Sequence, residues 1–194
     1  MTFEQCIRSI TSKITAHEGK EPLIIAIDGK SASGKSTFAA RLADELGVQV
    51  IATDDFYRPR NNSGELDISL YDGNFDIERF SREVVSNLNG DGFEYGVFDC
   101  RSGSIKETKS IAPYNAIVIE GAYSVDPKLG DYAGIKIFFD ISAEEQIKRI
   151  EKRNGREGVK RFTEIWIPAE ERYFSYYGIK KLCDLLVNND AEEM

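Results

Sequence analysis

Residues 23–37, LIIAIDGKSASGKST, are the most informative part of the sequence about the fold. Its first half is apolar and rich in isoleucine, which is typical of a strand buried on both faces of a parallel sheet. Its second half contains Gly29, four further residues, and then Gly34, Lys35 and Ser36. This is the complete G-x-x-x-x-G-K-[ST] spacing of a phosphate loop. A strand, this loop and a following helix together predict that the chain binds a nucleotide.

The chemistry explains why these residue types occur together. Glycines let the backbone turn tightly and bring N–H groups against phosphate oxygens. A helix that begins near Lys35 directs its unpaired N–H groups and its positive dipole end at the same place, and the Lys35 ammonium adds charge over the terminal phosphates. Ser36 is the expected ligand of Mg²⁺. We therefore assign the whole loop to the nucleotide: Gly29, Lys30, Ser31, Ala32, Ser33, Gly34, Lys35, Ser36 and Thr37.

Composition restricts the class of protein and its partners. With 194 residues, 41% of them hydrophobic, the chain suits one α/β domain with a mobile flap. Its net charge of -8 argues against nucleic acid and against an anionic membrane, and no apolar run approaches the ~20 residues that span a bilayer. The 3 cysteines are far apart and suit reduced thiols in the cytoplasm. We expect a small-molecule partner and leave the oligomeric state open, a homo-oligomer included.

Further buried strands alternate with helices along the chain. Apolar runs predict strands at 48–52, 116–119, 135–139 and 185–187, and an edge strand at 94–99. Amphipathic or capped segments predict helices at the N-terminus, after the phosphate loop, from Asp76 to about Leu88, from Ser142 to about Arg153, and at 163–182, where Pro168 is an interruption or boundary. This order predicts a three-layer α/β fold with a central parallel sheet flanked by helices, and the phosphate loop after the first strand makes it a P-loop NTPase fold.

Acidic residues follow the buried strands, at the sheet edge where ligands bind in such folds. Transfer of a phosphoryl group from the nucleotide to an alcohol, the acceptor, needs a carboxylate that orients and deprotonates the hydroxyl. Asp54, which follows strand 48–52, is our candidate for this base. The Phe56–Tyr57 pair could form a wall of the acceptor pocket. Asp55 is the alternative base, and both aspartates could instead form a turn or a helix cap. Glu120 is a candidate Mg²⁺ ligand with Ser36 and Asp54, although it could also be an ordinary acid at a strand end.

A basic segment follows in this acidic protein. Residues 148–161 contain seven Lys or Arg and two Glu, a local charge of 7 - 2 = +5. Arg149 and Arg153 are four residues apart on one helix face, which Arg156 would continue. A solvated helix face is the ordinary explanation, but after a phosphate loop we favour a lid at about 149–162 that brings arginines to the transferred phosphoryl group. A second excursion, residues 57–75, is rich in turn residues and is expected on the acceptor side.

Five motifs occur together in order: GKSASGKST, TDDFY, NFD at 74–76, IVIEG at 117–121, and RIEKRNGR at 149–156. In this combination the chain resembles the uridine kinase family of P-loop small-molecule kinases, from Ile24 to Val187. The resemblance implies an ATP-dependent kinase with Asp54 as base, and with Ser36 and Glu120 at the metal. It also implies that the arginines act in the lid.

The chain departs from that family where the acceptor is chosen. Members carry a tyrosine-aspartate stretch followed by a histidine and an arginine that hold the nucleoside, whereas Gly103 and Ile105 stand here. A nucleoside is the acceptor that the resemblance implies, and another metabolite stays an alternative. Candidate acceptor contacts are Asp54 and Tyr57 with three further side chains, Tyr71, Arg101 and Tyr123.

Three other classes of P-loop or nucleotide-binding protein fit less well. A hydrolytic switch or motor would be expected to show the Asn-Lys-x-Asp guanine motif or the Leu-Ser-Gly-Gly transporter signature, and the sequence has neither. A nucleoside monophosphate kinase needs no base for its acceptor, so Asp54 argues for an alcohol. A binding module without catalysis would not need Lys35, Ser36, Asp54 and Glu120 together.

Overall fold

The computed structural model describes residues 1–58, 74–99 and 102–190. Its centre is a five-stranded parallel sheet in the order β2-β5-β1-β6-β7. The strands are β1 (Leu23–Gly29), β2 (Gln49–Ala52), β5 (Ala116–Glu120), β6 (Ile135–Asp140) and β7 (Leu185–Asn188). The five predicted strands of the central sheet are therefore confirmed, with ends that differ by one residue or two.

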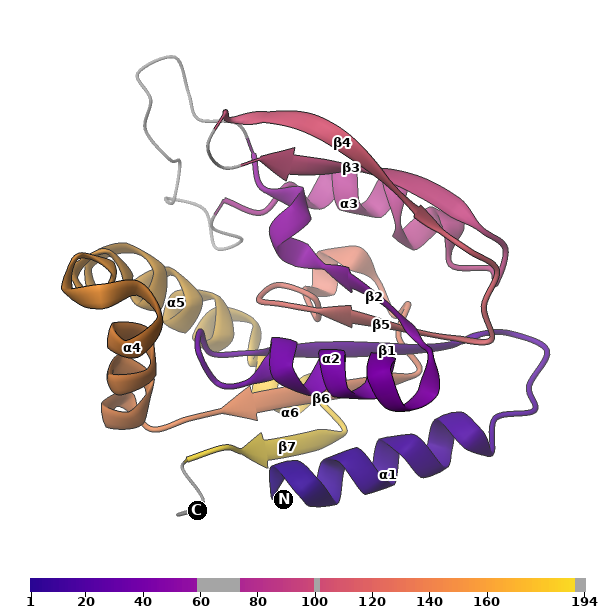
Figure 1. Cartoon of the computed structure of the whole chain (residues 1–194), viewed down its shortest axis with the longest axis horizontal. Coiled ribbons are helices and arrows are strands. Elements are labelled where there is room, and N and C mark those ends of the chain that lie inside the picture. The colour runs from indigo at the N-terminus through magenta and orange to yellow at the C-terminus, as the bar shows by residue number, and fades with distance from the viewer. Residues whose placement is uncertain (59–73, 100–101, 191–194) are drawn as a thin grey trace.

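The sheet is buried on both faces because its strands are apolar at consecutive positions. One face, with Ile25 and Ile27 of β1, packs in a core cluster with α1 (Phe3–Thr15) and α2 (Lys35–Leu46). The other face, with Ile24 and Ala26, packs against residues of α3 (Ile77–Glu83), α5 (Ile167–Tyr177) and α6 (Ile179–Leu182). These layers confirm the predicted three-layer α/β fold (Figure 1).

Short helical turns complete the connections. They are the 3-10 turns η1 (Thr53–Phe56), η2 (Val85–Asn87) and η3 (Pro127–Leu129), and the π-helical turn η4 (Phe162–Trp166). The helix expected from Asp76 to Leu88 is shorter than predicted, since α3 ends at Glu83 and η2 follows. Asp76 does cap it, because its carboxylate accepts a hydrogen bond from the backbone N–H of Arg79 at 3.1 Å.

A separate two-stranded sheet corrects the prediction of an edge strand at 94–99. β3 (Phe93–Asp99) pairs in antiparallel fashion with β4 (Ser104–Ile111), and neither strand belongs to the central sheet. β4 was not predicted, because seven of its eight residues are exposed and the strand therefore has no hydrophobic alternation. Tyr95 and Val97 of β3 pack into the core beside α3.

The helix after β6 also differs from the prediction, which ended it near Arg153. α4 extends over Ala143–Arg161 with one break at Gly155, whose φ of 69° and ψ of -177° are not helical. η4 and α5 follow directly, and Pro168 lies in the first turn of α5, where a missing N–H costs no hydrogen bond. In Figure 1 the arrows of β5, β6 and β7 point to the side where α4 and α5 lie.

The strand ends are level at this carboxyl edge of the sheet. Glu120, the last residue of β5, is in register with Ile27 of β1 on one side and with Ala52 of β2 on the other. The phosphate loop, Glu120 and η1 therefore follow one another across three adjacent strands. No helix in the described part of the chain combines the length and the apolar character needed to cross a bilayer.

Candidate active site

The phosphate loop adopts a conformation that its glycines make accessible. Gly29 has a φ of 137°, and a Cβ there would lie 2.1 Å from the carbonyl oxygen of Phe139. Gly34 has a φ of 100° and forms the N-cap of α2. A side chain at either position would therefore force the loop to change, since positive φ values of this kind are strained for other residues.

The loop carries the groups that an anion requires. α2 begins at Lys35 with no side-chain cap, which leaves the N–H groups of its first turn to a ligand. The Lys35 ammonium donates to the carbonyl oxygens of Gly29 at 2.7 Å and Lys30 at 2.8 Å, so it lies over the loop. The buried Ser33 hydroxyl has no hydrogen-bond partner among the described residues. These residues fit a polyphosphate.

Oxygen donors for a divalent cation lie beside the loop. The Ser36 hydroxyl donates to the Glu120 carboxylate at 3.0 Å and 3.2 Å. Burial raises the pKa of Glu120, and the nearby Lys35 ammonium opposes that shift. No group of three or more His, Cys, Asp or Glu side chains suited to a metal occurs in the described ranges. A hydroxyl and one carboxylate fit Mg²⁺, which keeps several waters and binds phosphates as further ligands.

Asp54 and Asp55 lie in η1 but have different partners. Asp54 lines the cleft beside the loop and accepts a hydrogen bond from the Tyr57 hydroxyl at 2.6 Å. Asp55 accepts from Lys109 at 2.8 Å and from the Tyr95 hydroxyl at 3.1 Å, both on the two-stranded sheet. Asp55 therefore joins η1 to β3 and β4, whereas Asp54 is available to a ligand in the cleft.

The cleft has a volume of about 510 Å³ and brings most of the predicted residues together. Those that line it are Ser31, Ala32, Gly34, Lys35, Ser36, Thr37, Asp54, Tyr57, Glu120, Tyr123, Arg149 and Arg153. They come from the phosphate loop, the ends of β2 and β5, and α4. Segments up to 122 residues apart, from Ser31 to Arg153, thus contribute to one site.

Some predicted residues lie elsewhere. Gly29 and Ser33 belong to the loop but do not line the described cleft, and the Lys30 side chain turns away to Asp140, at 3.0 Å, and to the carbonyl oxygen of Ile141. The side chain of Arg156 is 95% exposed beside Glu151. Two further predictions, Tyr71 and Arg101, lie outside the described residues, as does most of the expected excursion 57–75.

The two arginines of α4 in the cleft are held differently. Arg149 donates to Glu145 at 2.9 Å and to the carbonyl oxygen of Asn189 at 2.7 Å, and a longer contact of 3.5 Å reaches the carbonyl oxygen of Ala32 in the phosphate loop. Arg153 contacts its neighbour Asn154 and lies 5.6 Å from the ring of Phe162. Arg149 is therefore fixed against the loop, whereas the contacts of Arg153 are with its neighbour Asn154 and with Phe162 of η4.

Four residues after the break at Gly155 line the cleft and were not predicted as site residues. Arg161 ends α4, Phe162 and Trp166 belong to η4, and Glu170 belongs to α5. The Trp166 ring stacks on Tyr57 with centroids 6.2 Å apart. The one feature of the sequence that could have indicated η4 as part of the site is Trp166 itself, a single tryptophan that follows the basic segment 148–161. No local pattern indicated that Glu170 would reach a loop residue 139 positions away in the chain.

Comparisons with known proteins agree with this geometry. A family model described as cytidylate kinase matches residues 25–63, which include the phosphate loop and Asp54. The uridine kinase of Halalkalibacterium halodurans is 30% identical over 148 residues, 72% of this chain and 70% of that protein. The uridine kinase of Mycoplasma genitalium is 28% identical over 181 residues, 85% of this chain and 84% of that protein.

A solved structure supports the fold independently. The structure of a possible uridine kinase from Bacillus stearothermophilus matches with a TM-score of 0.73 at 18% identity, over 96% of this chain and 100% of that chain. The parallel sheet, the phosphate loop and the cleft at its carboxyl edge define a P-loop kinase of small molecules. Its sequence relatives narrow the class further: the chain belongs to the uridine kinase family.

Proposed function

We propose that the chain transfers the terminal phosphoryl group of ATP to a hydroxyl of a nucleoside. The observation that carries this proposal is that one cleft contains both the uncapped phosphate loop and the Asp54 carboxylate. Phosphoryl transfer to an alcohol needs this pairing, because one side of the site must hold phosphates and the other must orient a hydroxyl. Relatives whose names state uridine as the substrate support the nucleoside.

Asp54 is the base in this proposal, and Asp55 is not. The Tyr57 hydroxyl engages one oxygen of Asp54, which fixes the carboxylate, and we assign the acceptor's proton to the other oxygen. Asp55 is bound by Lys109 and Tyr95, so its charge is already used to hold η1 against the two-stranded sheet. Moving Asp55 into the cleft would break both contacts.

The nucleotide and its metal have a matching set of residues. We assign the phosphates to the loop amides and to Lys35, and the cation to Ser36 and Glu120, with Asp54 near its water shell. Mg²⁺ would neutralise charge on the phosphates as the phosphoryl group leaves. Burial disfavours the charged form of Glu120 and raises its pKa. A bound cation would supply the opposite charge that stabilises the buried carboxylate.

We assign residues 149–162 as a lid on a single kinase domain that spans the chain. Gly155 supplies a break in α4, and the segments on both sides contribute residues to the cleft. Closure would exclude water and bring Arg153, and with it Arg156, toward the transferred group. The stacked arrangement of the Trp166 and Tyr57 rings supports a connection between the lid and the acceptor side.

A kinase for a non-nucleoside hydroxyl is the second candidate. Where the family has two polar side chains that hold the nucleoside, this chain has Gly103, with open space around it, and Ile105, which is 53% exposed. Tyr57 and Tyr123 line the cleft and would contact either kind of acceptor.

Acceptor-stimulated ADP release separates the two candidates. Purified protein with ATP and Mg²⁺ is tested against nucleosides, sugars and vitamin alcohols. We expect uridine or cytidine to stimulate release well above the rate with water alone. Stimulation only by a sugar or another alcohol would establish the second candidate. If no acceptor stimulates release from protein that binds ATP in calorimetry, the kinase assignment fails.

A further inference from the structure

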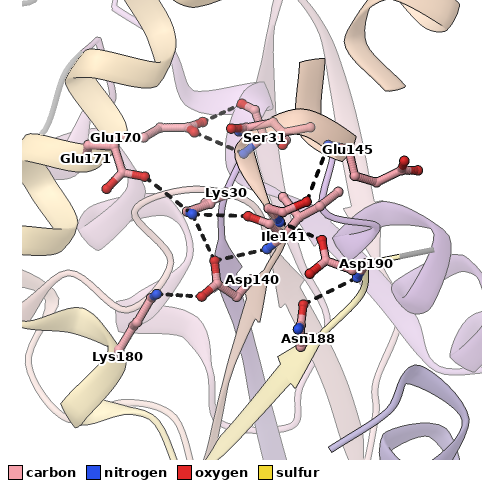
Figure 2. A network of polar contacts seen from close by, with 12 residues as sticks. Lys30, Ser31, Asp140, Ile141, Glu145, Glu170, Glu171, Lys180, Asn188 and Asp190 are labelled. Carbon is pink, nitrogen blue, oxygen red and sulfur yellow. Dashed lines mark hydrogen bonds and ion pairs between the residues drawn. The ribbon is translucent and has the colours of Figure 1, made fainter. Parts of the chain in front are cut away.

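Glu170 of α5 contacts the phosphate loop at two points. Its carboxylate accepts a hydrogen bond from the backbone N–H of Ser31 at 2.9 Å and another from the Ser31 hydroxyl at 2.5 Å. Figure 2 shows both contacts, with the Glu170 side chain reaching from α5 to the loop. Glu170 is only 6% exposed, so water competes little for these bonds.

Ser31 is also held from the other side of the lid. The Gln146 amide of α4 donates to the carbonyl oxygen of Ser31 at 3.0 Å. The N–H, the hydroxyl and the carbonyl of this one residue therefore bind Gln146 in α4 and Glu170 in α5, which lie on either side of residues 149–162 in the chain. Ser31 is thus the point where both ends of the lid meet the phosphate loop.

The neighbouring carboxylate of α5 has a different environment. Glu171 has a half-exposed side chain and lies 3.7 Å from the Lys30 ammonium, which is already bound to Asp140 (Figure 2). Exposed pairs at such a distance contribute little. Two adjacent glutamates of one helix thus differ sharply, since one is buried on the loop and the other is at the surface.

We propose that Glu170 is a positioning residue that fixes the phosphate loop at Ser31 and couples the occupancy of that loop to the lid. This inference rests on the proposed nucleotide site. A loop held in its binding conformation before the nucleotide arrives loses less entropy on binding. Because α5 follows η4 directly, a shift of Ser31 on binding is transmitted to Trp166 through Glu170. Both carboxylate oxygens of Glu170 are engaged by Ser31, so its role here is to position the loop and not to act as a catalytic group.

Amide hydrogen exchange of nucleotide-free protein tests the positioning. In Glu170→Ala we expect faster exchange across residues 29–34 than in the wild type, because both bonds to Ser31 are lost. Glu170→Gln should remain near the wild type, since an amide can accept from the N–H and donate to the hydroxyl oxygen. The matched control Glu171→Ala removes the same charge one residue away and should leave exchange of the loop unchanged.

Nucleotide binding and fluorescence test the coupling. Trp166 is the only tryptophan of the chain, so its emission reports on η4. With Mg²⁺ and the non-hydrolysable analogue adenylyl imidodiphosphate, calorimetry should show roughly tenfold weaker binding in Glu170→Ala, the cost of about one charge-assisted hydrogen bond. The emission change of the wild type at saturation should be largely lost in this variant and retained in Glu170→Gln and Glu171→Ala.

Each alternative outcome contradicts a stated part of the proposal. Unchanged exchange of the loop amides and unchanged nucleotide affinity in folded Glu170→Ala would overturn it. An equal loss of affinity in Glu170→Gln would also overturn it, because that result would indicate a role for the charge and not for the hydrogen bonds. If Glu170→Ala does not fold, Ser31→Ala, which removes only the hydroxyl bond, must weaken binding, or the proposal fails. The wild type could bind no nucleotide while Glu170→Ala still shows faster exchange of the loop amides. This result would overturn the proposed function and the coupling to the lid, but not the positioning of the loop by Glu170.

Discussion

Asp54 and Asp55 are adjacent residues with the same chemistry and different environments. The sequence left the choice of base open between them, because either could follow a strand into the site. The partners of Asp55, Lys109 and Tyr95, come from strands whose pairing could not be anticipated from a polar segment. The difference between these two neighbouring carboxylates thus depends on contacts that span 40 and 54 residues of chain.

Asparagine substitutions test the choice directly. Asp54→Asn should lower kcat by roughly 10² or more while ATP still binds, because the amide cannot accept the acceptor's proton. The matched variant Asp55→Asn should retain most of kcat and lower the melting temperature instead, since it weakens contacts to Lys109 and Tyr95. Steady-state kinetics and thermal melts on both variants measure these effects. The reverse pattern would make Asp55 the base.

Other residues of the site were predictable for a simple reason. The loop spacing identifies Lys35 and Ser36, and an acid directly after an apolar strand identifies Glu120, which the structure places 3.0 Å from the Ser36 hydroxyl. Lys30 has a loop position but a side chain bound to Asp140 on β6. A motif therefore fixes the path of the backbone but not the direction of every side chain on it.

At the scale of elements, the region from α4 to α5 differs most from expectation. Glycines and a run of positive charge suggested that helix would stop near Arg153, yet α4 resumes after Gly155 and continues to Arg161. Gly155 has a φ of 69° with nothing within 4 Å of a Cβ, so backbone conformation and not packing requires glycine there. The break lies between Arg153 and the residues of η4, where a lid would bend.

Alanine substitution in α4 tests whether this element acts as a lid. Arg153→Ala should lower kcat roughly tenfold or more with little change in melting temperature, because its charge acts on the transferred group in the closed state. Lys152→Ala removes the same charge from the adjacent, exposed position and is the control, expected to retain kcat. An effect of Arg153→Ala on stability alone would indicate an ordinary solvated helix face.

At the scale of the whole molecule, Asp28 connects three parts of the fold. It lies on β1, is fully buried, and accepts hydrogen bonds from the backbone N–H groups of Gly29 and Val125 and from the Tyr173 hydroxyl of α5. Burial raises its pKa to about 6, against the opposing effect of these three donors. A raised pKa means that the folded state holds the proton more tightly than the unfolded state.

The pH dependence of stability should therefore have a defined sign. Between the unfolded and folded pKa values the folded state binds more protons, so the contribution of Asp28 falls as pH rises. The quantity to measure is the free energy of unfolding of the wild type minus that of Asp28→Asn, from urea titrations. It should fall by about 2 kcal/mol from about pH 4.5 to about pH 7. A difference that is constant or that grows would contradict a raised pKa.

Asp140 provides the opposite case as a control. Burial acts to raise its pKa, but hydrogen bonds from Lys180 and Lys30 outweigh burial and lower it. A lowered pKa gives stability that is present at neutral pH and lost as pH falls. The free energy of unfolding of the wild type minus that of Asp140→Asn should therefore fall as the pH is lowered, measured in the same urea titrations.

The parallel sheet, its covering helices, the phosphate loop and the family could all be predicted from the amino-acid sequence. This is possible because buried strands and a loop that must approach phosphates restrict residue types locally, over short windows. Three contacts became known from the folded chain: Asp55 is bound by β3 and β4, Lys30 turns to Asp140, and Glu170 binds Ser31. Each of these contacts joins residues distant in the chain, and which distant groups meet depends on how the layers pack rather than on any local pattern.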